Sequence, residues 1–162
     1  MSNRWFSEHR SDPWRRKARQ EGYRARSAFK LKEIQEKFTP IRHGDTVLDV
    51  GCAPGGWSQV ACELVGNEGI VVGVDLQTTS PIEGAYFIVG DIQDKVTQDA
   101  TLEAFQGRVI NTIISDISPD ISGRYDIDQA ISIDNGIMHM ISLANIPMIV
   151  LFGPTKSEKF AP

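Results

Sequence analysis

Residues 48–58 read Leu-Asp-Val-Gly-Cys-Ala-Pro-Gly-Gly-Trp-Ser, and this segment carries the strongest structural signal in the chain. It has the pattern of a buried strand that runs into a loop of small residues and then opens a helix. Glycines in such a loop let the backbone approach a ligand closely, and a helix N-terminus offers free N–H donors to an anionic group. The segment therefore predicts a cofactor-binding loop.

The spacing within this loop weighs against a dinucleotide-binding fold. Such a fold is expected to show Gly-x-Gly-x-x-Gly, whereas residues 51–56 read Gly-x-x-x-Gly-Gly with a proline inside. A tight strand-to-helix turn that binds no ligand is the alternative that the sequence leaves open.

Short apolar runs alternate with helical or polar segments along the rest of the chain, which is typical of a parallel sheet covered on both faces. The expected strands span Thr46–Gly51, Ile70–Leu76, Tyr86–Asp91, Val109–Ile117 and Pro147–Phe152. The expected helices span Ser27–Phe38, Trp57–Leu64, Lys95–Phe105 and Asp128–Ala144. The predicted fold class is α/β, with a basic N-terminal arm and helix at residues 1–43 and a single domain at residues 44–162.

The composition is that of an ordinary globular domain. The chain has 162 residues, of which 41% are hydrophobic, and this is the size of one domain. It contains no run of about 18 apolar residues that could span a membrane and does not begin like a signal peptide, so we expect a cytoplasmic protein. Its two cysteines, Cys52 and Cys62, are too few for a disulfide framework or a closed zinc site, so we predict no metal site.

The charges are distributed unevenly along the chain. Residues 1–43 hold 12 Lys or Arg and 5 Asp or Glu, whereas residues 44–162 hold 5 basic and 16 acidic residues. A basic arm is typical of proteins that bind a phosphate backbone, because Lys and Arg displace condensed counterions. A solvated helix without a nucleic-acid partner is the alternative. The candidate nucleic-acid-binding residues of the arm are Arg15, Arg16, Lys17, Arg19, Arg24 and Arg26.

Three acidic residues, Asp75, Asp91 and Asp116, stand at the ends of successive predicted strands. The carboxyl ends of parallel strands meet at one edge of the sheet, so we expect these side chains to line the ligand site. Asp75 is placed to accept both hydroxyls of a ribose, Asp91 to reach an adenine amino group, and Asp116 to lie near a cationic methyl donor. One such Asp is a weak signal because Asp commonly begins turns, but three after a glycine loop form a specific set.

Further motifs accompany the glycine loop: Arg-Ser-Ala-Phe-Lys-Leu at 26–31, Asp-Leu-Gln at 75–77, Gly-Asp-Ile at 90–92 and Ser-Asp-Ile-Ser-Pro-Asp-Ile-Ser-Gly at 115–123. With this combination the chain, from about Arg4 to Ser132, resembles the FtsJ/RrmJ-type ribosomal RNA 2′-O-methyltransferases. The resemblance implies a Rossmann-like methyltransferase fold in which helices flank a parallel sheet. It also implies S-adenosylmethionine as the cofactor and ribosomal RNA, or a ribosomal subunit, as the partner.

The resemblance assigns residues to the two parts of the reaction. It implies that Lys30 and Asp116 belong to a Lys-Asp-Lys-Glu catalytic set. A lysine can orient the ribose hydroxyl or take its proton, and a nearby carboxylate stabilises the positive charge. An exposed helix lysine without a catalytic role is the alternative for Lys30. The expected cofactor-binding residues are Gly51, Gly55, Gly56, Trp57, Asp75, Asp91 and Asp116.

The resemblance ends near Ser132. In the family the next strand carries the second catalytic lysine, whereas residues 147–153 contain none, and the aligned position is Val150 or a neighbour. Valine cannot transfer a proton. We also expect the sheet to be truncated after its fifth strand, without the family's glutamate, because the sequence stops at Pro162. The predicted activity is therefore weak or absent.

Residues 132–162 are instead similar to the nucleotide-sugar-binding segment of heptosyltransferase-like glycosyltransferases, which makes a chimera with a junction near residue 132 our interpretation. For this detached segment we expect a packing role alone. The fifth strand would form an edge of the sheet and would favour a homodimer, although Lys156 and Lys159 would oppose it. The positions that correspond to sugar-nucleotide contacts are Asp134, Gly136, His139 and Thr155.

Two functions of different classes remain in view. The first is a ribosomal RNA ribose 2′-O-methyltransferase that uses S-adenosylmethionine. The second is a non-catalytic chimeric α/β module that retains the cofactor pocket. The sequence does not identify which nucleotide would be modified.

Overall fold

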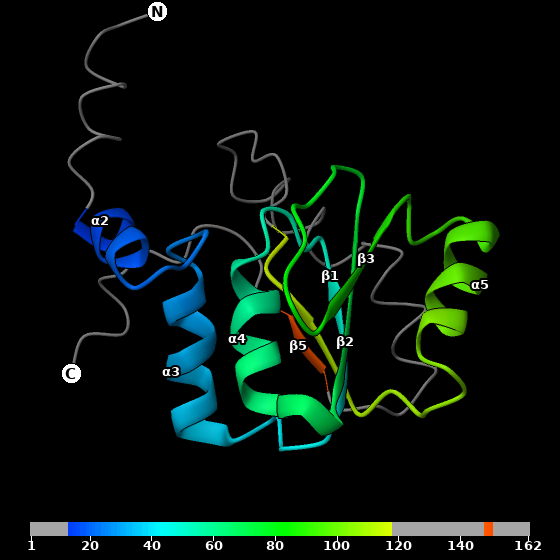
Figure 1. Cartoon of the computed structure of the whole chain (residues 1–162), viewed down its shortest axis with the longest axis horizontal. Coiled ribbons are helices and arrows are strands. Elements are labelled where there is room, and N and C mark those ends of the chain that lie inside the picture. Colours follow the sequence, from blue (N-terminus) through cyan, green and yellow to red (C-terminus); the bar gives the residue numbers. More distant parts are fainter. Residues whose placement is uncertain (1–12, 118–147, 151–162) are drawn as a thin grey trace, which may run out of the picture.

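The computed structural model describes residues 13–117 and 148–150, and within them five parallel strands form one sheet in the order β3-β2-β1-β4-β5 (Figure 1). The strands are β1 (Thr46–Val50), β2 (Ile70–Asp75), β3 (Ala85–Val89), β4 (Thr112–Ser115) and β5 (Met148–Val150). The helices are α2 (Pro13–Gln20), α3 (Ala28–Phe38), α4 (Gly56–Val65), α5 (Lys95–Ala104) and the 3₁₀ turn η1 (Gly66–Glu68). The predicted parallel α/β sheet flanked by helices is confirmed.

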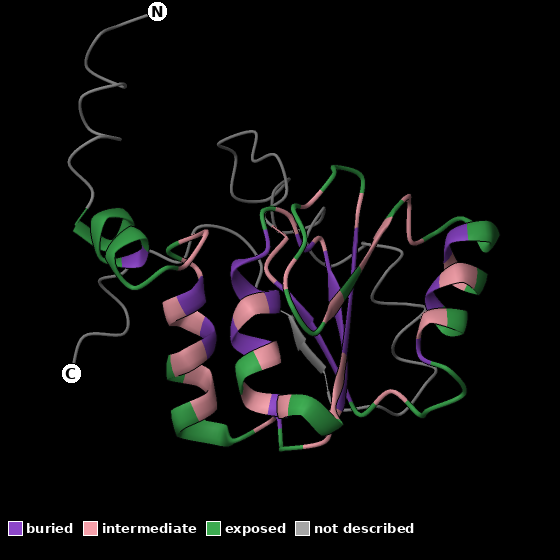
Figure 2. Cartoon of the chain, in the orientation of Figure 1, coloured by how far each residue is buried: buried purple, intermediate pink, exposed green. Residues whose placement is uncertain are grey.

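Helices cover both faces of the sheet (Figures 1 and 2). Because side chains alternate along a strand, β1 sends Val47 to one face and Leu48 to the other. Val47 packs in a buried cluster with residues of α3 and α4, including Trp57. Leu48 packs in a second cluster with Phe105, which directly follows α5. Both faces are therefore apolar, which explains the Val-rich strands.

The fourth strand is shorter than the predicted range of residues 109–117. Its pairing with β1 involves residues 112–114, because β1 itself begins at Thr46. Before that point Asn111 exchanges two bonds with Thr46: its N–H donates to the Thr46 carbonyl and its Oδ1 accepts from the Thr46 N–H, both at 2.8 Å. Val109 is 76% exposed. The apolar run therefore begins outside the sheet and enters it at Thr112.

The other expected elements whose ends lie within the described residues agree with the structure to within one or two residues at each end. Helix α2 was not predicted, because half of its eight residues are basic and Trp14 and Ala18, four positions apart, are a weak apolar signal on so short a segment. The helix expected at residues 128–144 lies outside the described residues. So do the positions in the tail that were aligned with sugar-nucleotide contacts.

A buried carboxyl group ties helix α4 to β1. Asp49 is 1% exposed and accepts a 2.6 Å hydrogen bond from the Ser58 hydroxyl in the first turn of α4. Burial raises the pKa of Asp49 to about 7, the nearby charges of Asp116 and Asp75 add to that rise, and the Ser58 bond opposes it. A raised pKa means that the folded state prefers the protonated acid.

We expect Asp49→Asn to become progressively more stabilising, relative to the wild type, as the pH rises from about 4 to about 7. The unfolded acid has a pKa of about 3.9, so between these values the folded wild type holds a proton that the unfolded chain has lost. Its free energy of unfolding therefore falls with rising pH, by up to about 4 kcal/mol, and levels off above pH 7. Asparagine has no such titration.

Thermal melts of both proteins from pH 4.5 to pH 8.5 measure this difference. Glu103→Gln is the matched control, because it also replaces one carboxyl group by an amide but at an exposed position on α5. A gap between Asp49→Asn and the wild type that stays constant with pH would rule out the raised pKa.

Candidate functional site

The loops that follow β1, β2, β3 and β4 lie at the same edge of the sheet, because all the strands are parallel. Strand β1 is central, with β2 on one side and β4 on the other. The chain therefore leaves β1 in one direction and later returns to its opposite side. In open α/β sheets, ligands bind in the crevice at such a switch point, outside the carboxyl ends of the strands.

The predicted glycine loop runs from β1 into α4 and is closely packed. Gly51 and Gly55 have φ angles of 73° and 105°, which favour glycine. A Cβ atom at Gly51 would lie 2.3 Å from Cγ1 of Ile117, and one at Gly56 would lie 2.9 Å from Cβ of Ala25. These glycines let the backbone of the loop touch both the segment after β4 and the N-terminal arm.

Asp75, at the end of β2, links the glycine loop to the loop that follows β2. Its Oδ2 accepts a 2.8 Å hydrogen bond from the Ala53 N–H, and its Oδ1 accepts one of 2.8 Å from the Gln77 N–H. Each carboxylate oxygen has a second lone pair, so both can still accept a hydroxyl donor. The side chain is partly exposed, as a ligand contact requires.

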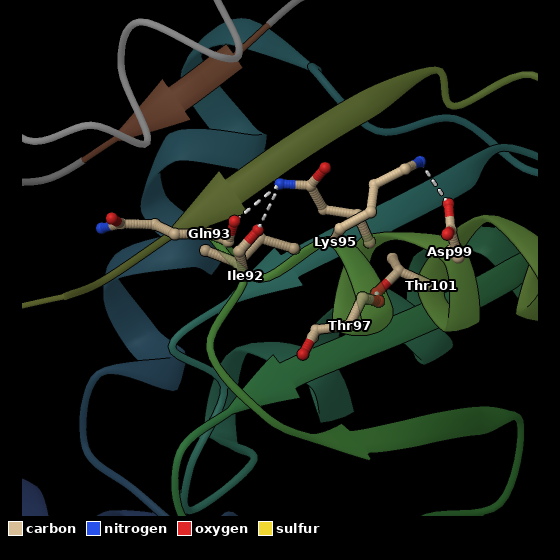
Figure 3. Close-up of polar contacts among 7 residues, drawn as sticks. Ile92, Gln93, Lys95, Thr97, Asp99 and Thr101 are labelled. Carbon is tan, nitrogen blue, oxygen red and sulfur yellow. Dashed lines mark hydrogen bonds and ion pairs between the residues drawn. The ribbon is translucent and has the colours of Figure 1, made fainter.

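Asp91 lies two residues beyond β3, in a turn that helix α5 holds in place. Its Oδ1 accepts a 2.9 Å hydrogen bond from the Gln93 N–H. From the first turn of α5, Nε2 of Gln98 donates to the carbonyls of Ile92 and Gln93, at 3.0 and 3.2 Å (Figure 3). The turn is thus fixed on both sides, which places Asp91 at the same edge of the sheet as Asp75.

Lys30 and Asp116 come together although 86 positions separate them. Lys30 projects from the first turn of α3, Asp116 directly follows β4, and Nζ of Lys30 lies 3.2 Å from Oδ1 of Asp116. Their side chains are 36% and 24% exposed, so the pair is accessible from solvent. The structure therefore joins the two residues that were predicted to be catalytic, beside the glycine loop.

Trp57 anchors the arm rather than facing the solvent. The ring is 3% exposed, and its Nε1–H donates a 2.8 Å hydrogen bond to the carbonyl of Ser27, just before α3. In this way the helix that follows the glycine loop holds the start of the helix that carries Lys30.

The six candidate RNA-binding residues of the arm fall into two groups. Arg24 is partly buried, and its guanidinium donates to the carbonyls of Ser80 and Pro81. The others have exposed side chains: Arg15, Arg16, Lys17 and Arg19 on α2 and Arg26 before α3.

Sequence reasoning missed an aromatic cluster in the arm. The ring of Phe29 lies 5.7 Å from that of Trp14 and 5.8 Å from that of Tyr23, measured between centroids. Nζ of Lys17 lies 5.3 Å from the Trp14 ring and 4.8 Å from the Phe29 ring. Aromatic residues interleaved with the basic ones were the signal that could have revealed it.

Both cysteines are free thiols, Cys52 buried and Cys62 partly buried. Burial raises their pKa values to about 12 and about 11, so neither is a ready nucleophile. Among the residues that the structure describes, no cluster of His, Cys, Asp or Glu is arranged to hold a metal ion. None of the described helices is long and apolar enough to cross a membrane.

Known proteins resemble this chain in both sequence and structure. A sequence profile described as FtsJ-like methyltransferase matches residues 23–153. A ribosomal RNA large subunit methyltransferase E from Alkalilimnicola ehrlichii is 47% identical over 128 residues, which are 79% of this chain and 61% of that protein. The protein of the same name from Methanobrevibacter smithii is 45% identical over 136 residues, which are 83% of this chain and 64% of that protein.

A crystal structure described as a ribosomal RNA methyltransferase from Plasmodium falciparum superposes with a TM-score of 0.71 at 30% identity, covering 79% of this chain and 77% of that one. The chain spans somewhat less than two thirds of the length of the two curated relatives. The profile match also extends past residue 132, where the sequence predicted a junction. The chain belongs to the FtsJ-like methyltransferase family.

Proposed function

We propose that this chain binds S-adenosylmethionine at the carboxyl edge of its sheet and transfers the methyl group to a ribose 2′-hydroxyl of ribosomal RNA. The contact between Lys30 and Asp116, 3.2 Å long and placed beside the glycine loop, carries this proposal. Relatives that share nearly half of the aligned residues are named ribosomal RNA methyltransferases, which supports the same substrate.

The hydrogen-bond acceptors at the edge suit this cofactor. The second lone pairs of Asp75 are available for the two ribose hydroxyls, and Asp91 is available for the adenine amino group. The N-terminus of α4 favours the carboxylate of the methionine part. The carboxylates of Asp75, Asp91 and Asp116 all lie at this edge, so the edge carries excess negative charge, which favours a sulfonium.

When bound, S-adenosylmethionine supplies an electrophilic methyl group whose bond to sulfur breaks as the bond to the ribose oxygen forms. The residues of the chain hold and deprotonate the nucleophile. Lys30, kept in place by Asp116, makes a hydrogen bond with the 2′-hydroxyl and fixes it in line with the methyl carbon. In its amine form Nζ of Lys30 takes the hydroxyl proton, and the ammonium so formed is stabilised by Asp116.

The arm provides the surface for RNA in this proposal. Its exposed basic side chains on α2 and before α3 supply positive charge for phosphates. Trp14 is 49% exposed and offers a ring on which a base can stack. Because Phe29 touches the Trp14 ring and precedes Lys30, this surface leads directly to the catalytic pair.

The rate of transfer is the part of the proposal that depends on β5. The backbone of Val150 pairs with Ser115, one residue before Asp116, so the strand expected to carry the second lysine runs beside the site. Valine at this position has no proton to transfer, so we expect turnover slower than that of relatives with two catalytic lysines. The second candidate function, a cofactor-binding module without turnover, rests on this same substitution.

The chimeric origin of residues 132–162, pairing of two copies through β5 and a cytoplasmic location stay predictions. The position of β5 at one side of the described sheet favours the pairing, because an outer strand has free backbone groups. Sedimentation of the purified chain distinguishes a dimer from a monomer.

We expect Lys30→Ala to abolish methyl transfer to ribosomal RNA while changing the Kd for S-adenosylmethionine less than about threefold, since loss of a general base typically costs 10²-fold or more in rate. Calorimetric titration gives the Kd, and transfer of a labelled methyl group gives the rate. Lys37→Ala is the matched control, because Lys37 is an exposed lysine in the last turn of the same helix.

Three outcomes are informative. Wild-type binding with transfer that Lys30→Ala abolishes supports the enzyme. Wild-type binding without any transfer supports the non-catalytic module. Absence of binding at saturating S-adenosylmethionine rejects both.

We expect Arg16→Ala and Arg19→Ala each to weaken RNA binding without changing the affinity for S-adenosylmethionine. Each lost phosphate contact should lower the slope of log Kd against log salt concentration by about 0.7 to 0.9. Filter binding at four salt concentrations measures this slope. Lys95→Ala, an exposed lysine on α5 away from the arm, is the control, and an equal effect of all three variants would contradict an RNA surface on the arm.

A further inference from the structure

Gln59 of helix α4 binds the backbone of the segment between α2 and α3 at two points. The Arg24 N–H donates a 2.8 Å hydrogen bond to Oε1 of Gln59, and Nε2 of Gln59 donates a 3.0 Å bond to the carbonyl of Gly22. Gln59 lies in the first half of α4, one turn after the glycine loop. The backbone at Arg24 is therefore fixed relative to that loop before its side chain makes any contact.

The Arg24 side chain then reaches the loop that follows β2. Its Nη2 donates a 2.6 Å hydrogen bond to the carbonyl of Pro81, and its Nη1 donates to the carbonyl of Ser80. These two carbonyls are consecutive in the chain, and the planar guanidinium presents its donors as a rigid fork that can meet both at once. The loop after β2 is thereby tied to the arm across more than 50 positions of sequence.

The Arg24 guanidinium also lies next to the glycine loop. A Cβ atom at Gly55 would lie 3.3 Å from Nη1 of Arg24, 3.2 Å from Cγ2 of Thr79 and 3.0 Å from Cδ1 of Ile82. The guanidinium, the loop after β2 and the glycine loop therefore meet at one point. Asp75 lies at the other end of this region, where its carboxylate accepts hydrogen bonds from Ala53 in the glycine loop and from Gln77 in the loop after β2.

We propose that Arg24 is a positioning residue for the methyl-donor pocket rather than a phosphate contact of the RNA surface. It holds residues 79–82 against Gly55. The glycine loop and the loop after β2, which both bond to Asp75, therefore keep a fixed separation in the ligand-free protein. This inference rests on the proposed cofactor site. Moving the guanidinium to a phosphate would break both of its hydrogen bonds to the loop after β2, which opposes a role on the RNA surface.

Arg24→Ala tests the inference, with Arg19→Ala as the charge-matched control from the exposed face of the arm. We expect Arg24→Ala to weaken S-adenosylmethionine binding at least tenfold in calorimetry while leaving the salt dependence of RNA binding unchanged. Arg19→Ala should give the opposite pattern. Arg24→Lys should recover part of the cofactor affinity, because one ammonium can reach one carbonyl but cannot reproduce the fork.

Hydrogen exchange of the ligand-free chain provides a readout that is independent of cofactor binding. The Ala85 amide, which donates a 3.1 Å hydrogen bond to the Ile82 carbonyl, should exchange faster in Arg24→Ala than in the wild type, whereas the amides of β1 should not. If Arg24→Ala lowers the melting temperature sharply, the milder Arg24→Lys variant gives the same comparison in a folded protein.

The outcomes separate the inference from the proposed function. Cofactor affinity within twofold of the wild type, with the RNA salt slope reduced as in Arg19→Ala, would make Arg24 a phosphate contact and overturn the inference. Wild-type protein that fails to bind S-adenosylmethionine defeats the proposed function instead. In that case unchanged exchange at Ala85 would also overturn the positioning role, whereas faster exchange would show that Arg24 still holds the loop after β2.

Discussion

The turn between β1 and α4 has almost no space for side chains, and the arrangement of the site depends on this constraint. A methyl group on Gly51 would overlap Ile117 beyond β4, and one on Gly56 would press against Ala25 of the arm. Protein interiors are packed too densely to absorb such groups without movement of the backbone. The same turn therefore fixes the segment that carries Asp116 and the arm that carries Lys30.

Helix α4 connects this turn both to the sheet and to the N-terminal arm, through two neighbouring residues of its first turn. Ser58 binds the buried Asp49 of β1, and Trp57 binds the carbonyl of Ser27 in the arm. A lysine on a separate N-terminal helix thereby acquires a fixed distance from the sheet. Such preorganisation suits methyl transfer, in which the nucleophile and the methyl carbon have to be held in line.

The strands and the edge that bears Asp75 and Asp116 could be predicted from sequence, because strands buried on both faces need continuous apolar runs and parallel strands end at one edge. Helix α2 was missed because Trp14 and Ala18 give a single apolar repeat within eight residues, and the contact that fixes its place joins Trp14 to Phe29, 15 positions along the chain. Arg24 was assigned to the RNA surface because it is one of the many basic residues in the arm. The sequence does not show that its side chain binds backbone carbonyls more than 50 positions away.

A crystal structure of the chain with S-adenosylmethionine tests most directly whether the edge beside β1 holds a methyl donor in front of Lys30. We expect the ribose hydroxyls within hydrogen-bond distance of Asp75 and the sulfonium on the side of Asp116 and Lys30. Ligand density at another surface, or an empty edge at saturating ligand, would contradict the assignment.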